Sequence, residues 1–580
     1  MQDTDIPMTD TAVSRRFVPQ HLDASDWLQL EPLYAELRDR EIDSLESLHR
    51  WLSDFSELSS VVSEQATRRR IAHACHTDDP DIERAYMHFV EQIVPRIRPM
   101  LFQLQKRFLE APQAQRLEGE RFEVLQREWQ AEVDLFREAN IPLQTQVTKL
   151  VSEYDKLAGA MTVEFRGEQY TLQQMARFLE EPDRSVRQQA WTITVERRLQ
   201  DCESIESIFD DLFELRKRIA AHADKPDYRA YVWQEYGRFD YTPEACHDYA
   251  DAVEQLVVPL IRELDEQRRS ALDLEALRPW DLAVDVHGRD PLRPFEPERP
   301  QGLVEGVRAT LECLCPSLAE EFAQLKIPDH LDLESRPGKR AGGFQAALEE
   351  SGEPFIFMNA AGVHRDVETL LHEAGHAFHF RWAHANEPLA FLRHAPMEFC
   401  EVASMALELM AGDYLDVFYP VEEELARARR TLLTGAVRVL PWIATIDQFQ
   451  HWLYTNPDHT PEQRRVRWEQ IYSRFEGGVV DWSEYEQARS HLWHRQLHLF
   501  HRPFYYIEYG IAQLGALQMW KRFREDSEGA LRDYRAALAL GGGRPLPDLF
   551  QAAGLTLDFS HDTIEPVVEM VRQELAKLPE

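Results

Sequence analysis

Apolar residues recur three and four positions apart along most of the first part of the chain. Between about residues 26 and 156 this spacing is nearly continuous, as at Leu101, Leu104 and Phe108, and it gathers apolar side chains on one helix face. The pattern changes at 161–172, where apolar and polar residues alternate around a central Arg-Gly pair, as is typical of a small hairpin. We therefore expect a helical N-terminal lobe over residues 21–200 that contains this hairpin.

Prolines and alternating stretches organise the rest of the chain. Pro291, Pro294, Pro297 and Pro300 predict a loop or a crossing between lobes, and the sequence GGGRPLP at 541–547 predicts a second loop. The best strand candidates are the alternation near 281–286 and the run PFIFMN at 354–359. We expect a mainly helical, two-lobed protein with a flexible N-terminus at 1–20 and a small β-sheet in a catalytic lobe at 201–580.

The sequence after PFIFMN predicts a buried helix near 366–385. Asp366 can cap its start, and an apolar stripe follows at Val367, Leu371, Ala374 and Phe378. The motif HEAGH, residues 372–376, lies inside this helix.

The spacing of this motif is that of a metal-binding helix. His372 and His376 are four positions apart, so both imidazoles leave the same face and can share one tetrahedral ion. A metal ion lowers the pKa of a bound water, and Glu373 is placed to remove the proton from that water. The motif predicts a zinc-dependent hydrolase.

A catalytic zinc site needs a third protein ligand. The apolar helix expected at 396–412 carries three glutamates, and buried glutamates are costly unless they are paired or bind a metal. We predict Glu401 as the third ligand, with Glu398 as the alternative. Glu408, seven residues later on the same face, is predicted to hold a ligand histidine through its other ring nitrogen.

Two further segments offer groups that could contact a peptide. The aromatic-rich stretch 493–520 supplies candidate hydrogen-bond donors for an oxyanion: His498, His501, Tyr505, Tyr506 and Tyr509. The loop GKRAGGFQ places Gly342 and Gly343 ahead of PFIFMN. If this strand lies at a sheet edge, a peptide can pair with its backbone, so Phe357 and Asn359 are expected at the substrate.

Composition restricts the partners. The chain has 101 acidic and 65 basic residues, a net charge of -36, which repels nucleic acid and anionic membranes. The opening sequence has no signal-peptide core, no apolar run is long enough to span a bilayer, and the six cysteines are scattered. These features predict a cytoplasmic protein with reduced thiols.

HEAGH, the glutamate 25 residues beyond His376 and the late tyrosine-rich helix resemble the thimet oligopeptidase and oligoendopeptidase F family of zinc metallopeptidases. The oligoendopeptidase F branch is the closer match. The resemblance is carried by LVSEYDKLAGAMTVEFRG, FMNAAGVHRDVETLLHEAGHAFH, FCEVASMALE, DQFQHWLYTNPDHT and PFYYIEY. It covers most of the chain beyond the first hundred or so residues, and those first residues match no family that we could name.

The resemblance implies roles for individual residues. It implies one zinc ion per chain bound by His372, His376 and Glu401, with Glu373 as the base. It also implies that His498, Tyr506 and Tyr509 steady the oxyanion; because the spacing differs between branches, Tyr505 or His501 could substitute. A two-lobed helical fold with a deep channel, and a preference for short unstructured peptides, are further expectations.

The expected activity is cleavage of internal peptide bonds, and two alternatives stay open. A zinc carboxypeptidase would need a cation to hold a terminal carboxylate, for which Arg340, Arg365 and Arg502 are available. A catalytically silent peptide-binding protein usually loses a ligand or the base, whereas this chain keeps the whole set. The sequence predicts neither the cleavage preference nor the oligomeric state.

Overall fold

The computed structural model describes residues 15–296, 299–336, 338–340 and 342–579 of the chain. Residue contacts divide it into two compact units, each built from segments far apart in the sequence. Unit 1 takes its described residues from the ranges 1–134, 292–432 and 512–557, and unit 2 from 135–291, 433–511 and 558–580. The lobes expected at 21–200 and 201–580 were contiguous, whereas these units are not.

Both units are mainly helical, as predicted. Unit 1 holds α1 (Trp27–Asp39), α2 (Leu45–Cys75), α3 (Pro80–His88), α4 (Val94–Glu110), α5 (Glu120–Leu135), α12 (Pro300–Leu314), α13 (Pro316–Phe322), α14 (His364–Asn386), α15 (Met397–Ala411), α21 (Ser527–Leu538) and α22 (Leu546–Ala552). Unit 2 holds α6 (Asn140–Gly159), α7 (Arg184–Gln200), α8 (Cys202–His222), α9 (Tyr228–Glu235), α10 (Pro243–Ala252), α11 (Val258–Ala271), α17 (Pro461–Phe475), α18 (Glu486–Ser490), α19 (Leu497–His501) and α23 (His561–Lys577). Two boundaries between the units fall inside α16 (Glu422–Thr455) and α20 (Ile507–Glu525), and a third separates Leu135 from the rest of α5.

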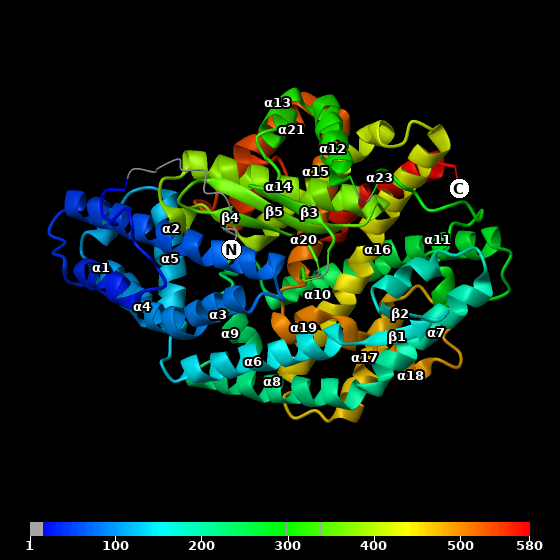
Figure 1. Cartoon of the computed structure of the whole chain (residues 1–580), viewed down its shortest axis with the longest axis horizontal. Helices are drawn as coiled ribbons and strands as arrows, with labels where there is room; N and C mark the ends of the chain where they lie inside the picture. Colours follow the sequence, from blue (N-terminus) through cyan, green and yellow to red (C-terminus); the bar gives the residue numbers. More distant parts are fainter. Residues whose placement is uncertain (1–14, 297–298, 337, 341, 580) are drawn as a thin grey trace. The chain divides into compact units, whose positions relative to one another are not determined.

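The strands form two small sheets. In unit 2, β1 (Thr162–Phe165) and β2 (Glu168–Thr171) make the expected hairpin, with Phe165 opposite Glu168. Arg166 and Gly167 both have positive φ at its turn. In unit 1, β3 (Leu331–Glu334), β4 (Phe344–Leu348) and β5 (Glu353–Ala360) form one sheet in the order β3-β5-β4, with β3 parallel and β4 antiparallel to β5 (Figure 1).

The strand expected at PFIFMN is therefore the middle strand of its sheet, so the condition for peptide pairing with it, an edge position, is not met. Both ladders of β5 are occupied by neighbouring strands, because the turn at 349–352 folds β5 back against β4. In the sheet that the structure describes, β4 and β3 are the edges.

The prediction of a strand at 281–286 was wrong. This segment begins at the end of a short 3-10 helix, Pro279–Asp281, and continues without strand pairing in the described structure. The buried carboxylate of Asp281 accepts hydrogen bonds from Arg184 at 2.8 Å and from Arg187 at 2.9 Å. These ion pairs anchor the start of the segment to α7.

Proline placement was partly mispredicted as well. Pro300 does not belong to the expected loop but begins α12, since a proline at the first helical position lacks only an N–H that would have no helical partner. Pro297 lies outside the described residues. The expected loop at 541–547 ends at Pro545, and α22 begins at Leu546.

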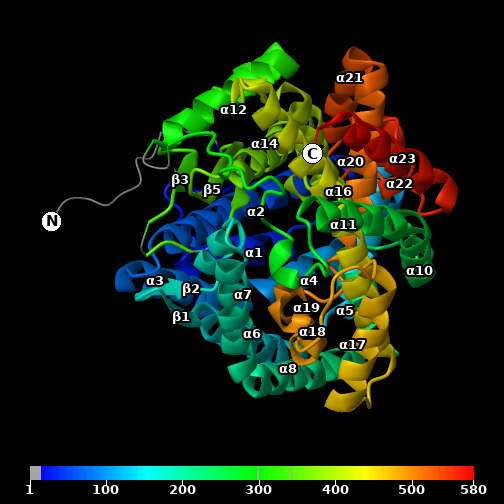
Figure 2. The same ribbon diagram turned by 90° about the vertical axis from the view of Figure 1, so that its right-hand side faces the viewer.

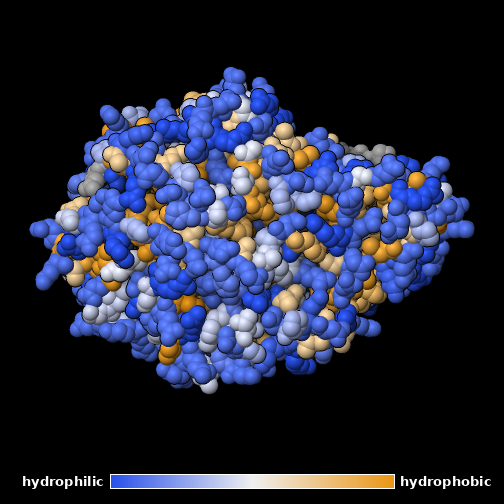
Figure 3. Space-filling view, turned by 180° about the vertical axis from the view of Figure 1, so that it is seen from behind, coloured by the Kyte–Doolittle hydropathy of each residue, from blue (hydrophilic) through white to orange (hydrophobic). Residues whose placement is uncertain are grey.

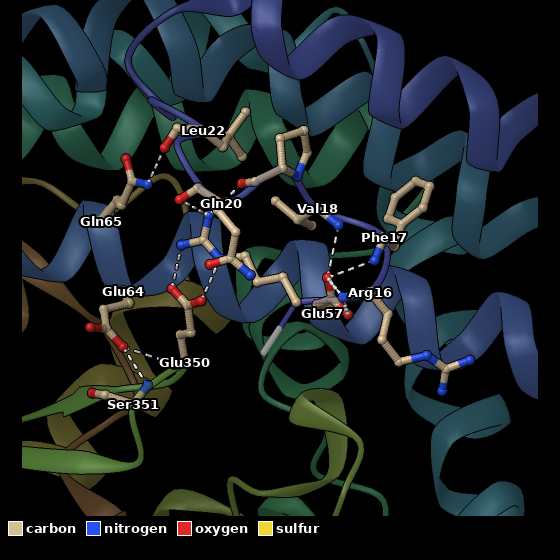
Figure 4. A network of polar contacts seen from close by, with 12 residues as sticks. Arg16, Phe17, Val18, Gln20, Leu22, Glu57, Glu64, Gln65, Glu350 and Ser351 are labelled. Carbon is tan, nitrogen blue, oxygen red and sulfur yellow. Dashed lines mark hydrogen bonds and ion pairs between the residues drawn. The ribbon is translucent and has the colours of Figure 1, made fainter. Parts of the chain in front are cut away.

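The N-terminal segment is fastened to unit 1 from Arg15 onward (Figure 4). The carboxylate of Glu57 on α2 accepts hydrogen bonds from the backbone amides of residues 16, 17 and 18. Arg15 forms a two-pronged ion pair with Glu350, in the turn between β4 and β5, and Glu64 of α2 accepts the backbone amides of Glu350 and Ser351. These contacts tie the start of the described chain to both α2 and the sheet; residues 1–14 of the expected flexible terminus lie outside the described residues.

The sheet and α2 share a small apolar core. It contains Ile71, Ala346 and Phe355, and α14 packs on β4 and β5. Figure 2 shows α21 and α22 side by side in orange and red, and these helices contact α14 and α15 respectively. The helix that carries HEAGH is thus held between a sheet and other helices.

The face of the molecule seen in Figure 3 is mainly hydrophilic, with apolar side chains scattered over it. None of the helices in the described part of the chain combines the length and the apolar character that a membrane span requires. All six cysteines are free.

Candidate metal centre

The helix α14 places the two motif histidines as the spacing predicts. It begins at His364, and the carboxylate of Asp366 accepts the backbone amides of Ala361 and Val363 at 2.8 and 3.0 Å. The apolar stripe from Val367 to Phe378 is buried. Because this stripe faces the core, the opposite face carries His372 and His376, whose side chains are 24% and 17% exposed.

The helix α15 brings a carboxylate to the same point. Oε2 of Glu401 lies 3.4 Å from Nε2 of His372 and 3.6 Å from Nε2 of His376, and the two Nε2 atoms are 3.2 Å apart. Glu398, the alternative third ligand, does not belong to this group. Three potential ligand atoms from two helices therefore meet at one point.

These separations fit a tetrahedral zinc ion. Nitrogen and oxygen ligands about 2.0–2.1 Å from zinc lie about 3.3 Å from each other at the tetrahedral angle, close to all three observed distances. Glu401 is buried, and within the described residues its ion-pair partners are His372 and His376 alone. Ser404 donates to the same carboxylate at 3.3 Å.

A close approach of two backbones makes the meeting possible. A Cβ placed on Gly375 would lie 2.6 Å from Cα of Ser404 and 2.8 Å from the carbonyl oxygen of Ala403. Only glycine leaves space for α15 at this point of α14. Tyr534 of α21 donates a hydrogen bond to the same Ala403 carbonyl at 2.6 Å, so a third helix contacts α15 at this residue.

Glu408 contacts the ring nitrogen of His372 that does not lie at the meeting point: its Oε1 is 2.6 Å from Nδ1 of His372. A carboxylate at Nδ1 favours the tautomer with the proton on that nitrogen and the lone pair on Nε2. Burial lowers the pKa of His372, but hydrogen bonds to Glu401 and Glu408 outweigh it and raise the pKa overall. A proton and a metal ion would compete for the same lone pair.

Glu373 is buried and interacts electrostatically with His372, His376 and Glu401. Burial raises its pKa above the usual value, although His372 and His376 and the backbone amide of Gln345 on β4 act in the opposite direction. A carboxylate with a raised pKa is a better proton acceptor than an ordinary one.

The aromatic residues predicted at the oxyanion come together in unit 2. The ring centroid of His498 lies 4.9 Å from that of Tyr506, 5.7 Å from Tyr509 and 5.8 Å from Tyr505. His501 does not join them, because its Nε2 lies 2.8 Å from the carboxylate of Asp155.

Two residues that the sequence did not single out determine which ring nitrogen of His498 carries the proton. The indole N–H of Trp442 donates to Oε1 of Gln496 at 2.9 Å, which leaves the amide nitrogen of Gln496 facing Nδ1 of His498 at 2.8 Å. An amide N–H can only donate, so Nδ1 accepts and the ring proton of neutral His498 is on Nε2. This ring therefore presents an N–H donor at Nε2.

A strained turn positions the tyrosines. Phe504 has a φ of 66°, which is rare for a bulky residue. Its amide donates to Gln450 at 2.5 Å, and its carbonyl accepts from Arg238 at 2.6 Å. Arg238 also pairs with Glu508 at 2.8 Å in a buried ion pair. Together these contacts hold the turn that leads into α20.

The residues expected to bind substrate through the strand have other contacts. The side chain of Phe357 is fully buried and stacks on Phe344, 4.8 Å between centroids. Asn359 donates to the carbonyl oxygens of Arg340 and Gly342 at 2.8 and 3.0 Å. Gly342 has a φ of 98°, and a Cβ on Gly343 would lie 3.4 Å from the carbonyl of Phe357. Asn359 and Gly343 therefore fasten the loop to β5.

Comparison with known proteins agrees with this geometry. Residues 177–300 and 325–567 match the model of peptidase family M3, and residues 17–136 match the peptidase M3 N-terminal domain. The chain belongs to peptidase family M3. The family resemblance predicted from the sequence is confirmed, and it extends into the first hundred residues, which the sequence had not connected to any family.

Relatives and solved structures of this family cover different shares of the chain. An oligoendopeptidase F homolog of Borreliella burgdorferi is 24% identical over 331 residues, 55% of this chain and 54% of the relative. The chain spans about half the length of the curated relatives that it matches first. The structure of PZ peptidase A with an inhibitor has a TM-score of 0.89 at 26% identity, over 97% of this chain and 99% of that one. A protein assigned as oligoendopeptidase F has the same TM-score and coverage at 28% identity.

Proposed function

We propose that this family M3 chain is a zinc-dependent endopeptidase that cleaves internal bonds of short, unstructured peptides. The observation that carries the proposal is the meeting of His372, His376 and Glu401 at tetrahedral separations, with Glu373 beside them. His372, His376 and Glu401 would hold one zinc ion. When bound, zinc supplies the positive charge that acidifies water and polarises the scissile carbonyl.

The proton transfers in this proposal belong to Glu373. It accepts a proton from the attacking water and then gives it to the nitrogen of the leaving amine, which could not depart as an anion. Its burial and raised pKa suit both roles. Glu408 keeps His372 in the tautomer whose Nε2 lone pair points towards Glu401 and His376.

We assign stabilisation of the oxyanion to His498, Tyr506 and Tyr509. The family resemblance suggests these roles, and the N–H at Nε2 of His498 supplies the chemistry, since an oxyanion needs donors. Tyr505, stacked with His498 at 5.8 Å, is proposed to contact the substrate. His501 is a weaker candidate because Asp155 occupies its Nε2.

We propose that a peptide pairs with the outer edge of the sheet at β4 instead of with β5. β4 begins directly after Gly342 and Gly343, and the backbone amide of its Gln345 acts on the Glu373 carboxylate. Backbone pairing gives affinity with little side-chain selectivity, which suits a peptidase acting on varied short peptides.

The test is digestion of a mixed library of short peptides, some blocked at both ends, followed by mass spectrometry. The proposal predicts internal cleavage of blocked peptides that chelator abolishes and zinc restores. Cleavage confined to free C-termini would favour a carboxypeptidase. Zinc binding with no cleavage of any peptide would favour a peptide-binding protein.

A further inference from the structure

A second cluster of potential metal ligands lies in unit 2, where the proposed reaction uses none of its members. Cys246 on α10 meets Asp447 and His451 on α16. Each offers one ligand atom, and these atoms all lie within 4.8 Å of one another. Cys246 and Asp447 are fully buried, and His451 is 3% exposed.

The carboxylate of Asp447 is the unusual member. In the described part of the chain, neither of its oxygens has a hydrogen-bond partner. The hydroxyl of Tyr249, on the same helix as Cys246, donates elsewhere, to the carbonyl of Leu440 at 3.2 Å. A buried carboxylate is normally paired, hydrogen-bonded or bound to a metal. A cation beside Asp447 would therefore stabilise it.

The geometry around Asp447 points the same way. Asp447 and His451 are four residues apart on α16, and Oδ2 of Asp447 lies 3.3 Å from Nε2 of His451. That separation equals the distance expected between an oxygen and a nitrogen ligand on a tetrahedral zinc ion, about 3.3 Å. Nε2 of His451 has no hydrogen-bond partner among the described residues. Sγ of Cys246 lies within 4.8 Å of both ligand atoms.

We propose that Cys246, Asp447 and His451 bind a second divalent ion, of the zinc class, that is separate from the catalytic one. A thiolate with an imidazole and a carboxylate selects zinc or cobalt over calcium and magnesium.

The consequence of such an ion is structural. It would link α10 to α16, and the ring of His451 packs against Phe504 with centroids 5.3 Å apart. Phe504 is the strained residue that leads to Tyr505 and Tyr506. A bound ion would thus stiffen the support of the tyrosine cluster.

The competing occupant is a proton. Nη1 of Arg229 lies 3.4 Å from Nδ1 of His451, which is compatible with a neutral ring that accepts from Arg229 and donates from Nε2 to Asp447. In that arrangement the three residues hold no metal, and an experiment has to separate the two cases.

Substitution with cobalt distinguishes a metal ion from a proton at this site. The catalytic centre contains no sulfur, so a thiolate-to-cobalt absorption can come only from the cysteine site. The full-length protein would be purified, its zinc counted by mass spectrometry and then replaced with cobalt. The proposal predicts two metal ions per chain and a near-ultraviolet thiolate-to-cobalt absorption. Cys246→Ser should bind one ion and lose this absorption, whereas Cys313→Ser, at an exposed cysteine, should match the unmodified protein.

A third variant identifies the site independently of folding effects at Cys246. His372→Ala/His376→Ala should bind one ion, lose activity and still show the thiolate-to-cobalt absorption. One ion per chain in the unmodified protein, with no thiolate-to-cobalt absorption, would overturn the proposal and favour the proton-sharing arrangement.

Discussion

Glu408 of α15 and His372 of α14 are joined by a 2.6 Å contact between a carboxylate oxygen and Nδ1. Replacing Glu408 with Gln weakens the preference for the tautomer that leaves Nε2 unprotonated, and Glu408→Ala removes it. Loss of such a partner typically weakens metal binding about 10- to 100-fold. Competition with chelators of graded affinity measures the effect. Glu422→Gln, at an exposed glutamate of α16, is the control that should leave zinc affinity unchanged; equal affinities in all variants would contradict this role.

Gly375 is predicted to be indispensable for the metal centre. In Gly375→Ala the new methyl group meets the backbone of Ala403 and Ser404, so α15 must shift and carry Glu401 with it. Overpacking of this kind costs about 1–3 kcal/mol. We expect a lower unfolding midpoint together with reduced zinc content.

Gly435 provides the matched control for that change. It is also a helical glycine, but a Cβ there meets nothing within 4 Å. Gly435→Ala should therefore stabilise the protein by up to about 1 kcal/mol. Normal zinc content and activity in Gly375→Ala would show that the close approach is not required.

Gln496 is predicted to act through His498. Gln496→Leu removes the donor to Nδ1 and releases the tautomer that places the proton on Nε2. The expected result is a decrease in kcat with little change in KM, bounded by the roughly 100- to 1,000-fold cost of losing one oxyanion donor. In a double-mutant comparison, adding Gln496→Leu to His498→Ala should have no further effect. A further loss would mean that Gln496 acts by another route.

Glu476 gives unit 2 a pH-dependent stability. Burial raises its pKa to about 6, above the ordinary 4.5, despite its ion pair with Arg489 at 2.6 Å. Between these values the unfolded chain has lost the proton and the folded chain keeps it, so stability falls as pH rises from about 4.5 to 6. The penalty above pH 6 is at most about 2 kcal/mol.

Glu476→Gln tests this because it removes the titrating group and keeps the shape. The difference in unfolding midpoint between the variant and the unmodified protein should shift in favour of the variant between pH 4.5 and 7. A difference that is constant with pH would show that Glu476 does not titrate in this range.

Local spacing was enough to predict the helix that carries HEAGH. Four-residue spacing fixes the common face of His372 and His376 wherever the helix lies. The same helical geometry placed Glu401 and Glu408 on one face of the next helix. These inferences need only the pitch of a helix and the cost of burying a carboxylate.

Features that depend on contacts distant in sequence were not predictable. PFIFMN reads equally well as an edge or a middle strand, because its apolar run reports burial and not its neighbours. The segment 281–286 alternates like a strand, yet its first residue, Asp281, ends a 3-10 helix and pairs with Arg184 and Arg187. The need for Gly375 depends on a backbone on α15, and the role of Gln496 depends on Trp442.

The most direct test of the central claim uses Glu373→Gln, which keeps the side-chain shape and removes the base. Zinc content and cleavage of an end-blocked peptide would be measured on the same preparation. The account predicts one catalytic zinc ion retained at His372, His376 and Glu401, with cleavage reduced by several orders of magnitude. A variant that holds zinc and cleaves the peptide at the normal rate would contradict the proposed mechanism.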